Sequence, residues 1–287
     1  MQIKNILFPT DFSERTRAIV PYIRAACERF DAKLTVLHSI FVPTMLSGLP
    51  EAPATFDFPF EEMKERAIDS MKMMAACFPR TYVEVLVKEG DPASAIATAV
   101  QEHGIDLVMM PTRGQGRFRA ALLGSVTAKV LHDVPCPVWT SAHCEQARPK
   151  HVSWERIICA VDTGEEAAPH LITAAAELAR EAANVQLVHA VQTYEPAAEN
   201  FGGAEFRAFL KESALETVDR LQKQCGTCFS VHVGEGRIAD VLRQAAVDRQ
   251  ADLVITGRGI LSHFAGGLRS QAYSVIRDMP CPVLSIR

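Results

Sequence analysis

The segment of this sequence best suited to binding a phosphate lies around two glycines. Gly114 and Gly124 are separated by nine residues, and Ser125 and Val126 follow directly. Glycine lets backbone N–H groups approach an anion, because no Cβ stands in the way. The pattern after Gly124 predicts the start of a helix, whose first amides lack intrahelical partners and favour negative charge. We therefore expect the amides of residues 124–126 to contact a phosphate.

Charged side chains accompany this loop. Asp11 follows the first apolar run and could accept hydrogen bonds from ribose hydroxyls, and Arg113, Arg117 and Arg119 could offset phosphate charge. The alternative is that the glycines only form turns while the arginines face water. The position of the loop, after one apolar run and before a helical pattern, favours the phosphate interpretation.

Alternating strands and helices must position these residues. The first half has five short apolar runs, which predict strands at 3–8, 33–38, 82–87, 106–110 and 137–140. They lack polar alternation, as is typical of strands buried on both faces of a parallel sheet. Ser13 and Asp91 are expected to cap the first and third helices. The second-half helices should begin near 164, 204, 237 and 268. In such a doubly wound sheet, ligands bind outside the carboxyl ends of the strands.

The second half of the chain repeats the first. Residues 6–11 match residues 157–162 at an offset of 151, and VPCPV near residue 136 matches MPCPV near residue 281. We predict two tandem domains, at 1–142 and 154–287, joined by a linker at 143–153. The linker is short and proline-bearing, so we expect the two domains to pack on each other.

Composition narrows the class of protein. The chain has 287 residues, 48% of them hydrophobic, and a formal net charge of −4. This profile is typical of a soluble globular protein and offers no broad basic surface for nucleic acid or an anionic membrane. No apolar run approaches the ~20 residues that span a bilayer, and the N-terminus has no signal-like stretch. The expected compartment is the cytoplasm.

Several segments together resemble the universal stress protein (UspA-like) family. They are FPTDFS, VLHSI, EGDPASAI, RGQGRFRAALLGSV and DVPCPVW, and the resemblance covers both halves. It implies two open five-stranded parallel sheets with helices on both faces, Rossmann-like and similar to adenine nucleotide alpha hydrolases. It also implies an adenine nucleotide as cofactor (ATP, ADP or AMP, with or without Mg²⁺). The nucleotide-binding residues so implied are Pro9, Thr10, Asp11, Ser39, Pro111, Gly114, Gly124, Ser125 and Val126.

The sequence departs from the family's loop pattern, G-x2-G-x9-G-[S/T], in both halves. Pro111 stands at the first glycine and removes an N–H donor. In the second half Arg269 occupies the position of Gly124, and Val161 replaces Thr10. We interpret the second half as impaired. The alternative is that Arg258 and Arg269 recognise a different anion.

Other candidate sites are weaker. Cys225-x-x-Cys228 is a redox or metal pair, or two incidental cysteines between a helix and a strand. His38 and His189, at equivalent places, are expected to pack and hydrogen-bond the backbone rather than catalyse. The stretch 41–60 is a lid or partner surface, or a loop packed on its own domain.

The functional prediction is a stress-response regulator that binds an adenine nucleotide in its first half and turns over little or none. No nucleophile–base pair is evident, so catalytic residues and bound metals are not expected. The alternatives are a slow Mg²⁺-dependent ATPase and a nucleotide-free scaffold. The family also implies that the terminal strands pair, whereas a homodimer is left open by the sequence.

Overall fold

The computed structural model describes residues 1–41, 59–113, 123–142, 154–164, 166–179, 184–191, 203–258 and 269–287, apart from the side chains of 269–273. The chain divides into two compact units. The N-terminal unit comprises residues 2–117 and 124–136, and the C-terminal unit comprises Met1, 118–123 and 137–287. Each is described by itself below.

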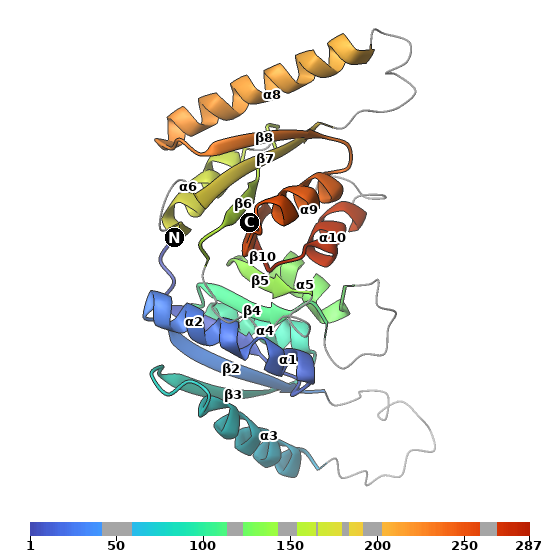
Figure 1. Cartoon of the computed structure of the whole chain (residues 1–287). Coiled ribbons are helices and arrows are strands. Elements are labelled where there is room, and N and C mark those ends of the chain that lie inside the picture. Colours follow the sequence, from blue (N-terminus) through green and yellow to red (C-terminus); the bar gives the residue numbers. More distant parts are fainter. Residues whose placement is uncertain are drawn as a thin grey trace, which may run out of the picture. The chain divides into compact units, whose positions relative to one another are not determined.

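The N-terminal unit alternates strands with helices (Figure 1). Its elements are β1 (Asn5–Pro9), α1 (Glu14–Ala18), α2 (Val20–Phe30), β2 (Lys33–Ile40), α3 (Phe60–Ala75), β3 (Val83–Glu89), α4 (Pro92–Glu102), β4 (Leu107–Pro111) and α5 (Ser125–Asp133). Both expected caps are confirmed, because Ser13 accepts from the amide of Thr16 and Asp91 accepts from the amide of Ser94.

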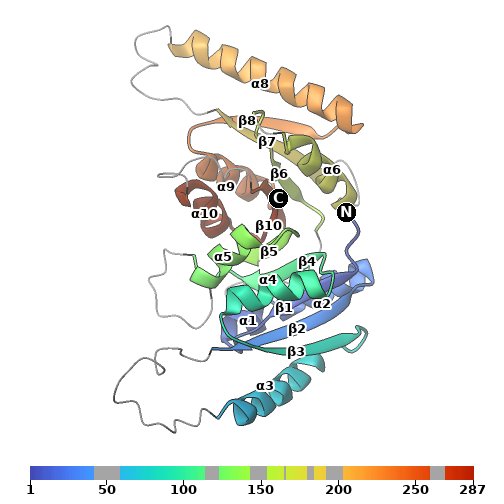
Figure 2. The same ribbon diagram turned by 180° about the vertical axis from the view of Figure 1, so that it is seen from behind.

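The strands of this unit are parallel and lie in the order β3-β2-β1-β4. The chain steps outward from β1 to β2 and β3, then returns to β4 on the other side of β1. Right-handed crossovers therefore put α1, α2 and α3 on one face, and α4 and α5 on the other. The two opposite views show this arrangement (Figures 1 and 2). The order of strands reverses at β1 and β4.

The core of the unit lies within the sheet and under the helices on both faces. Every residue of β4 is buried, as are Ile6 to Pro9 of β1. Strands that are apolar on both faces are the reason why the sequence shows continuous runs instead of alternation.

The C-terminal unit repeats the pattern and adds one strand. Its elements are β5 (Val138–Ser141), β6 (Ile157–Ala160), α6 (Ala168–Leu178), β7 (Val185–Val191), α8 (Gly203–Cys225), β8 (Ser230–Glu235), α9 (Ile238–Asp248), β9 (Leu253–Gly257), α10 (Arg269–Asp278) and β10 (Val283–Ile286). The strands β10-β9-β6-β7-β8 are all parallel, which confirms the five-stranded parallel sheet expected for a repeat.

The added strand comes from the first repeat. β5 pairs with β10 in antiparallel register, Trp139 opposite Leu284. The two terminal strands therefore pair, as the family resemblance implied, and β5 is grouped with the C-terminal unit. The domain boundaries at 142 and 154 stay a prediction.

Candidate functional site

The carboxyl ends of β1 and β4 form the edge where strand order reverses in the N-terminal unit. Leu7 pairs with Val108, so the residues after Pro9 and after Pro111 leave the sheet side by side. In an open parallel sheet such a point is the usual place for a ligand. The predicted site residues from β1 and β4 are thus brought to one edge.

The turn after β1 is held by its own side chains. Thr10 is buried; its amide donates to the Leu37 carbonyl at 2.8 Å, and its hydroxyl accepts from the Phe12 amide at 3.1 Å. Phe12 has a φ of 60°, in the left-handed region that a bulky residue rarely adopts. Strained backbone of this kind is concentrated at functional sites.

The Asp11 carboxylate is oriented by two donors. Its Oδ1 accepts from the Ser13 amide and from the Thr16 hydroxyl, both at 3.0 Å. These two hydrogen bonds fix the Asp11 carboxylate beside the end of β1, so the side chain is preorganised for a ligand.

His38 has the structural role expected of it. Its Nδ1 lies 2.8 Å from the Thr10 carbonyl oxygen, so this nitrogen carries the proton and donates. Its ring packs against Phe12 with centroids 4.6 Å apart. The next residue, Ser39, donates from its hydroxyl to the Gly90 carbonyl at 2.7 Å, which ties the end of β2 to the end of β3. Ser39 can still accept from a ligand.

The start of α5 corrects one expectation about Gly124. Its amide is not available to a phosphate, because it donates to the Thr112 carbonyl at 2.9 Å. Within the described ranges, the amides of Ser125, Val126 and Thr127 have no hydrogen-bond partner, and α5 has no side-chain cap. The donors open to an anion are therefore one residue further along than the sequence suggested.

Position 124 nevertheless requires a residue without a side chain. A Cβ there would lie 3.1 Å from the Thr112 carbonyl oxygen and 3.4 Å from the Arg113 Cα. The Thr127 hydroxyl lies 3.2 Å from the Pro111 oxygen and 3.3 Å from the Thr112 oxygen. These contacts hold the first turn of α5 directly against the end of β4.

Part of the predicted loop lies outside the described residues. This applies to Gly114 and to Arg117 and Arg119, as it does to most of the stretch 41–60 and to the linker 143–153. Pro9 and Pro111 are the last residues of β1 and β4.

The second repeat has a similar turn after its first strand, β6, but a buried arginine after β9. The Asp162 Oδ1 accepts from the Gly164 amide at 3.0 Å, and His189 Nδ1 lies 2.8 Å from the Val161 oxygen. Arg258 is buried with 5% of its surface exposed, and its Nε and Nη2 lie 3.3 and 3.2 Å from the Ser285 carbonyl oxygen. The guanidinium is directed at β10, so the alternative in which Arg258 recognises a soluble anion is disfavoured.

The cysteine pair gains no support as a site. α8 ends at Cys225, whose Sγ lies 3.5 Å from the Pro169 oxygen, and Cys228 is exposed. A helix carboxyl end does not stabilise a thiolate. No group of three or more His, Cys, Asp or Glu side chains that could hold a metal occurs in the described part of the chain.

These features define two copies of a doubly wound α/β fold, the first of which has a glycine-capped helix at its switch point. The family model for the universal stress protein family matches residues 2–141 and again residues 153–287. The chain therefore belongs to the universal stress protein family and carries two of its domains in tandem.

Individual relatives agree with this assignment. A universal stress protein of Thermus aquaticus is 33% identical over 139 residues, which are 47% of this chain and 96% of that protein. One of Methanocaldococcus jannaschii is 28% identical over 137 residues, or 47% of this chain and 79% of that protein. The crystal structure of a universal stress protein from Archaeoglobus fulgidus has a TM-score of 0.65 at 22% identity, covering 99% of this chain and 96% of that one. At that identity the likeness shows the fold alone.

No described helix has the length and apolarity needed to cross a membrane.

Proposed function

We propose that the first repeat binds an adenine nucleotide at the carboxyl ends of β1 and β4, and that occupancy carries a regulatory signal in a stress response. The observation that carries this proposal is the start of α5. Three successive amides, those of Ser125, Val126 and Thr127, lack partners within the described ranges and stand beside the switch point of the sheet. Such donors, together with the helix dipole, favour a phosphate.

The remaining groups have roles that suit a nucleotide. The oriented Asp11 carboxylate can accept from ribose hydroxyls, and Arg113 supplies a cation after β4. The full proposed set is Pro9, Thr10, Asp11, Ser39, Pro111, Gly114, Gly124, Ser125 and Val126. In it Gly124 contributes its lack of a side chain rather than its amide. ATP, ADP and AMP are the candidate nucleotides, with or without Mg²⁺.

Turnover is proposed to be slow or absent. Hydrolysis needs a positioned water and stabilisation of charge on the transferring phosphoryl group. The Oδ1 of Asp11 is already bound to Ser13 and Thr16. The sequence also contains no G-K-[S/T] element. These features favour binding over catalysis, and an ATPase is the rival function to be tested.

The second repeat is proposed to bind no nucleotide and to serve as a packing partner. Arg258, at the end of β9, is buried and directed at the Ser285 carbonyl, and Arg269 replaces the bare glycine. If neither repeat binds a nucleotide, the protein is a nucleotide-free scaffold, which is the second rival function. The cytoplasm is the proposed compartment, and another protein chain, including a second copy of this one, is the proposed partner class.

The test is to denature the purified protein and identify the small molecules released, then to titrate the ligand-free protein with ATP, ADP and AMP. We expect one adenine nucleotide per chain. Asp11→Asn should weaken binding by about tenfold or more. The matched control is Asp162→Asn, which changes the equivalent carboxylate of the second repeat and should leave affinity unchanged. Absence of binding, or equal effects of the two variants, would contradict the proposal.

A further inference from the structure

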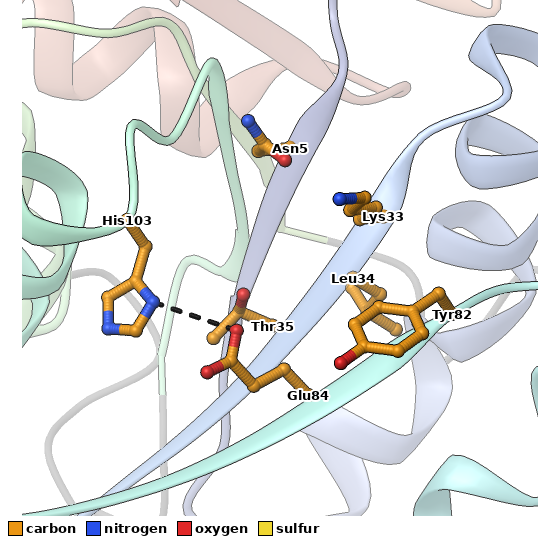
Figure 3. A pocket seen from close by; sticks show the side chains of 7 residues that line it. All are labelled: Asn5, Lys33, Leu34, Thr35, Tyr82, Glu84 and His103. Atoms are coloured by element: carbon orange, nitrogen blue, oxygen red, sulfur yellow. Dashed lines mark ion pairs between the residues drawn. The ribbon is translucent and has the colours of Figure 1, made fainter.

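A cavity of about 310 Å³ opens at the other edge of the N-terminal sheet, where β1, β2 and β3 begin and α4 ends (Figure 3). Its polar lining comes from Asn5, Lys33, Thr35, Tyr82, Glu84 and His103. This volume is at the lower end of the range for pockets that hold small ligands. Nothing in the proposed nucleotide function uses these residues.

The strand register explains why these side chains meet. Asn5 pairs with Lys33, and Thr35 pairs with Glu84 on the neighbouring strand. Side chains alternate along a strand, so Lys33 and Thr35 share one face, and residues paired across strands share it too. His103 is the C-cap of α4, which packs on β2. The polar residues therefore lie between the first residues of these strands and the end of α4.

Thr35 offers the cavity an open acceptor. Only 6% of this residue is exposed, and its hydroxyl makes no hydrogen bond within the described part of the chain. The Thr35 oxygen is not among the fully enclosed, unpartnered side-chain atoms of the described residues, so it faces the open space of the cavity that this residue lines. A ligand with donor groups would satisfy the Thr35 oxygen.

The cavity has a negative group, the Glu84 carboxylate, and a positive group, the Lys33 ammonium, at different parts of its wall. The Glu84 carboxylate lies beside Thr35, with His103 Nδ1 at 3.6 Å. The Lys33 ammonium lies 5.8 Å from the centre of the Tyr82 ring. Within the described ranges Lys33 and Glu84 form no ion pair with each other. Figure 3 shows Lys33 and Glu84 at different parts of the wall, with Thr35 nearer the carboxylate.

We propose that this cavity binds a small zwitterion of the free α-amino acid class. The ligand's ammonium group lies at Glu84 and Thr35, and its carboxylate lies at Lys33. Asn5 pairs with Lys33, so it lines the carboxylate end of the site, where its Nδ2 donates to the Gly104 carbonyl at 3.1 Å. The C-terminal end of α4, where His103 lies beside Glu84, adds partial negative charge on the ammonium side. A simple anion is disfavoured because the Glu84 carboxylate would repel it.

The test uses three molecules of almost the same shape: L-serine, L-serinamide, which lacks the carboxylate, and L-glycerate, which lacks the ammonium. Binding to the full chain is followed by calorimetry and by NMR signals of the His103 ring. We expect L-serine to bind with a Kd of about 1 mM or lower. Each analogue should bind at least about tenfold more weakly, because one charged contact is lost. No binding of L-serine, or equal binding of L-glycerate, would overturn the proposal.

Variants separate binding from folding. Glu84→Gln and Lys33→Met should each weaken L-serine binding by about tenfold or more. The matched controls are Lys88→Met and Glu102→Gln, which remove a pair 2.8 Å apart on the same strand and helix but outside the cavity lining. They should leave affinity unchanged. Thr35→Val should weaken L-serine binding while the melting temperature of the ligand-free protein stays the same or rises, since an unpaired hydroxyl is removed. Equal losses in the controls, or a Thr35→Val protein that binds normally, would contradict the site.

Discussion

The amide of Gly124 donates to the carbonyl oxygen of Thr112 at 2.9 Å, and a Cβ on Gly124 would lie 3.1 Å from that same oxygen. One short contact thus closes the loop between β4 and α5 and demands a residue without a side chain. The geometry sets the position of the next three amides, on which the proposed phosphate site depends.

We predict that Gly124→Ala lowers the free energy of unfolding by about 1 to 3 kcal/mol, because the new methyl group must displace the Thr112 carbonyl. The matched control is Gly164→Ala in the second repeat, where a Cβ would be at an ordinary 3.5 Å from Asp162 Oδ1. Urea unfolding measures the free energy of unfolding of both variants.

Gly124→Arg copies Arg269 of the second repeat into the first and should abolish nucleotide binding. Retained affinity would show that the loop is not the site.

A proline at residue 125 tests the amide itself. Gly124 has φ −63° and ψ 142°, the extended conformation that a residue before proline prefers, and proline is well tolerated at the first position of a helix. Ser125→Pro should therefore keep α5 folded while removing an N–H donor, and should weaken nucleotide binding by about tenfold. Ser125→Ala removes only the hydroxyl and should bind within about threefold of the parent protein. Indistinguishable affinities for the two variants would exclude a backbone contact at this residue.

The support of Asp11 by Thr16 can be tested through both stability and binding. Thr16→Val keeps the volume of this buried residue but removes the hydroxyl bond to Asp11 Oδ1. We expect a loss of about 1 kcal/mol in unfolding free energy and a weaker nucleotide affinity. The control is Thr173→Val, whose hydroxyl bonds the Pro169 carbonyl on an exposed helix surface. It should leave affinity unchanged; a Thr16→Val protein with normal affinity would show that Asp11 needs no such support.

ATP turnover should stay well below about 1 s⁻¹, the low end of ordinary enzyme rates. The reason is that the oriented Asp11 carboxylate is used in holding the turn, and the loop supplies donors but no identified base. Phosphate release under multiple-turnover conditions is the measurement. A faster rate that is lost in both Asp11→Asn and Ser125→Ala would establish the ATPase instead.

Two core thiols predict how stability depends on pH. Burial raises the pKa of Cys27 and of Cys159 to about 12, from an ordinary value of 9.0. The unfolded chain loses these protons near pH 9 while the folded chain keeps them, so their stabilisation is complete below pH 9 and is lost as the pH rises toward 12. In that window each thiol should lower the free energy of unfolding by about 1.4 kcal/mol per pH unit. Replacing either thiol with valine should remove its share of this pH dependence. Urea unfolding of the parent protein and of each variant across this pH range measures the slope, and an unchanged slope in both variants would contradict the prediction.

The sequence predicts most of the fold because the central strands, such as β1, β4, β6 and β9, are buried on both faces. Val108 and its neighbours form an uninterrupted apolar run, and Ser13 and Asp91 mark helix starts by side-chain chemistry that acts over three residues. Such signals are local, so they can be interpreted without knowing the tertiary structure.

The parts that could not be predicted depend on contacts between distant residues. The Gly124 amide is hydrogen-bonded to the Thr112 carbonyl because the end of β4 lies against the start of α5. The Arg258 guanidinium points at the Ser285 carbonyl because β9 lies beside β10. The cavity at Thr35 and Glu84 requires the strand register, which no motif in the sequence specifies.

The antiparallel pairing of β5 with β10 has a consequence for how the protein behaves in a cell. The two strands belong to one chain, so their association is a first-order event that dilution does not reverse. A version built from separate single repeats would dissociate as its concentration fell, and could also pair like with like. Here every molecule carries one loop with Gly124 and one with Arg269, in a fixed one-to-one ratio at any level of expression.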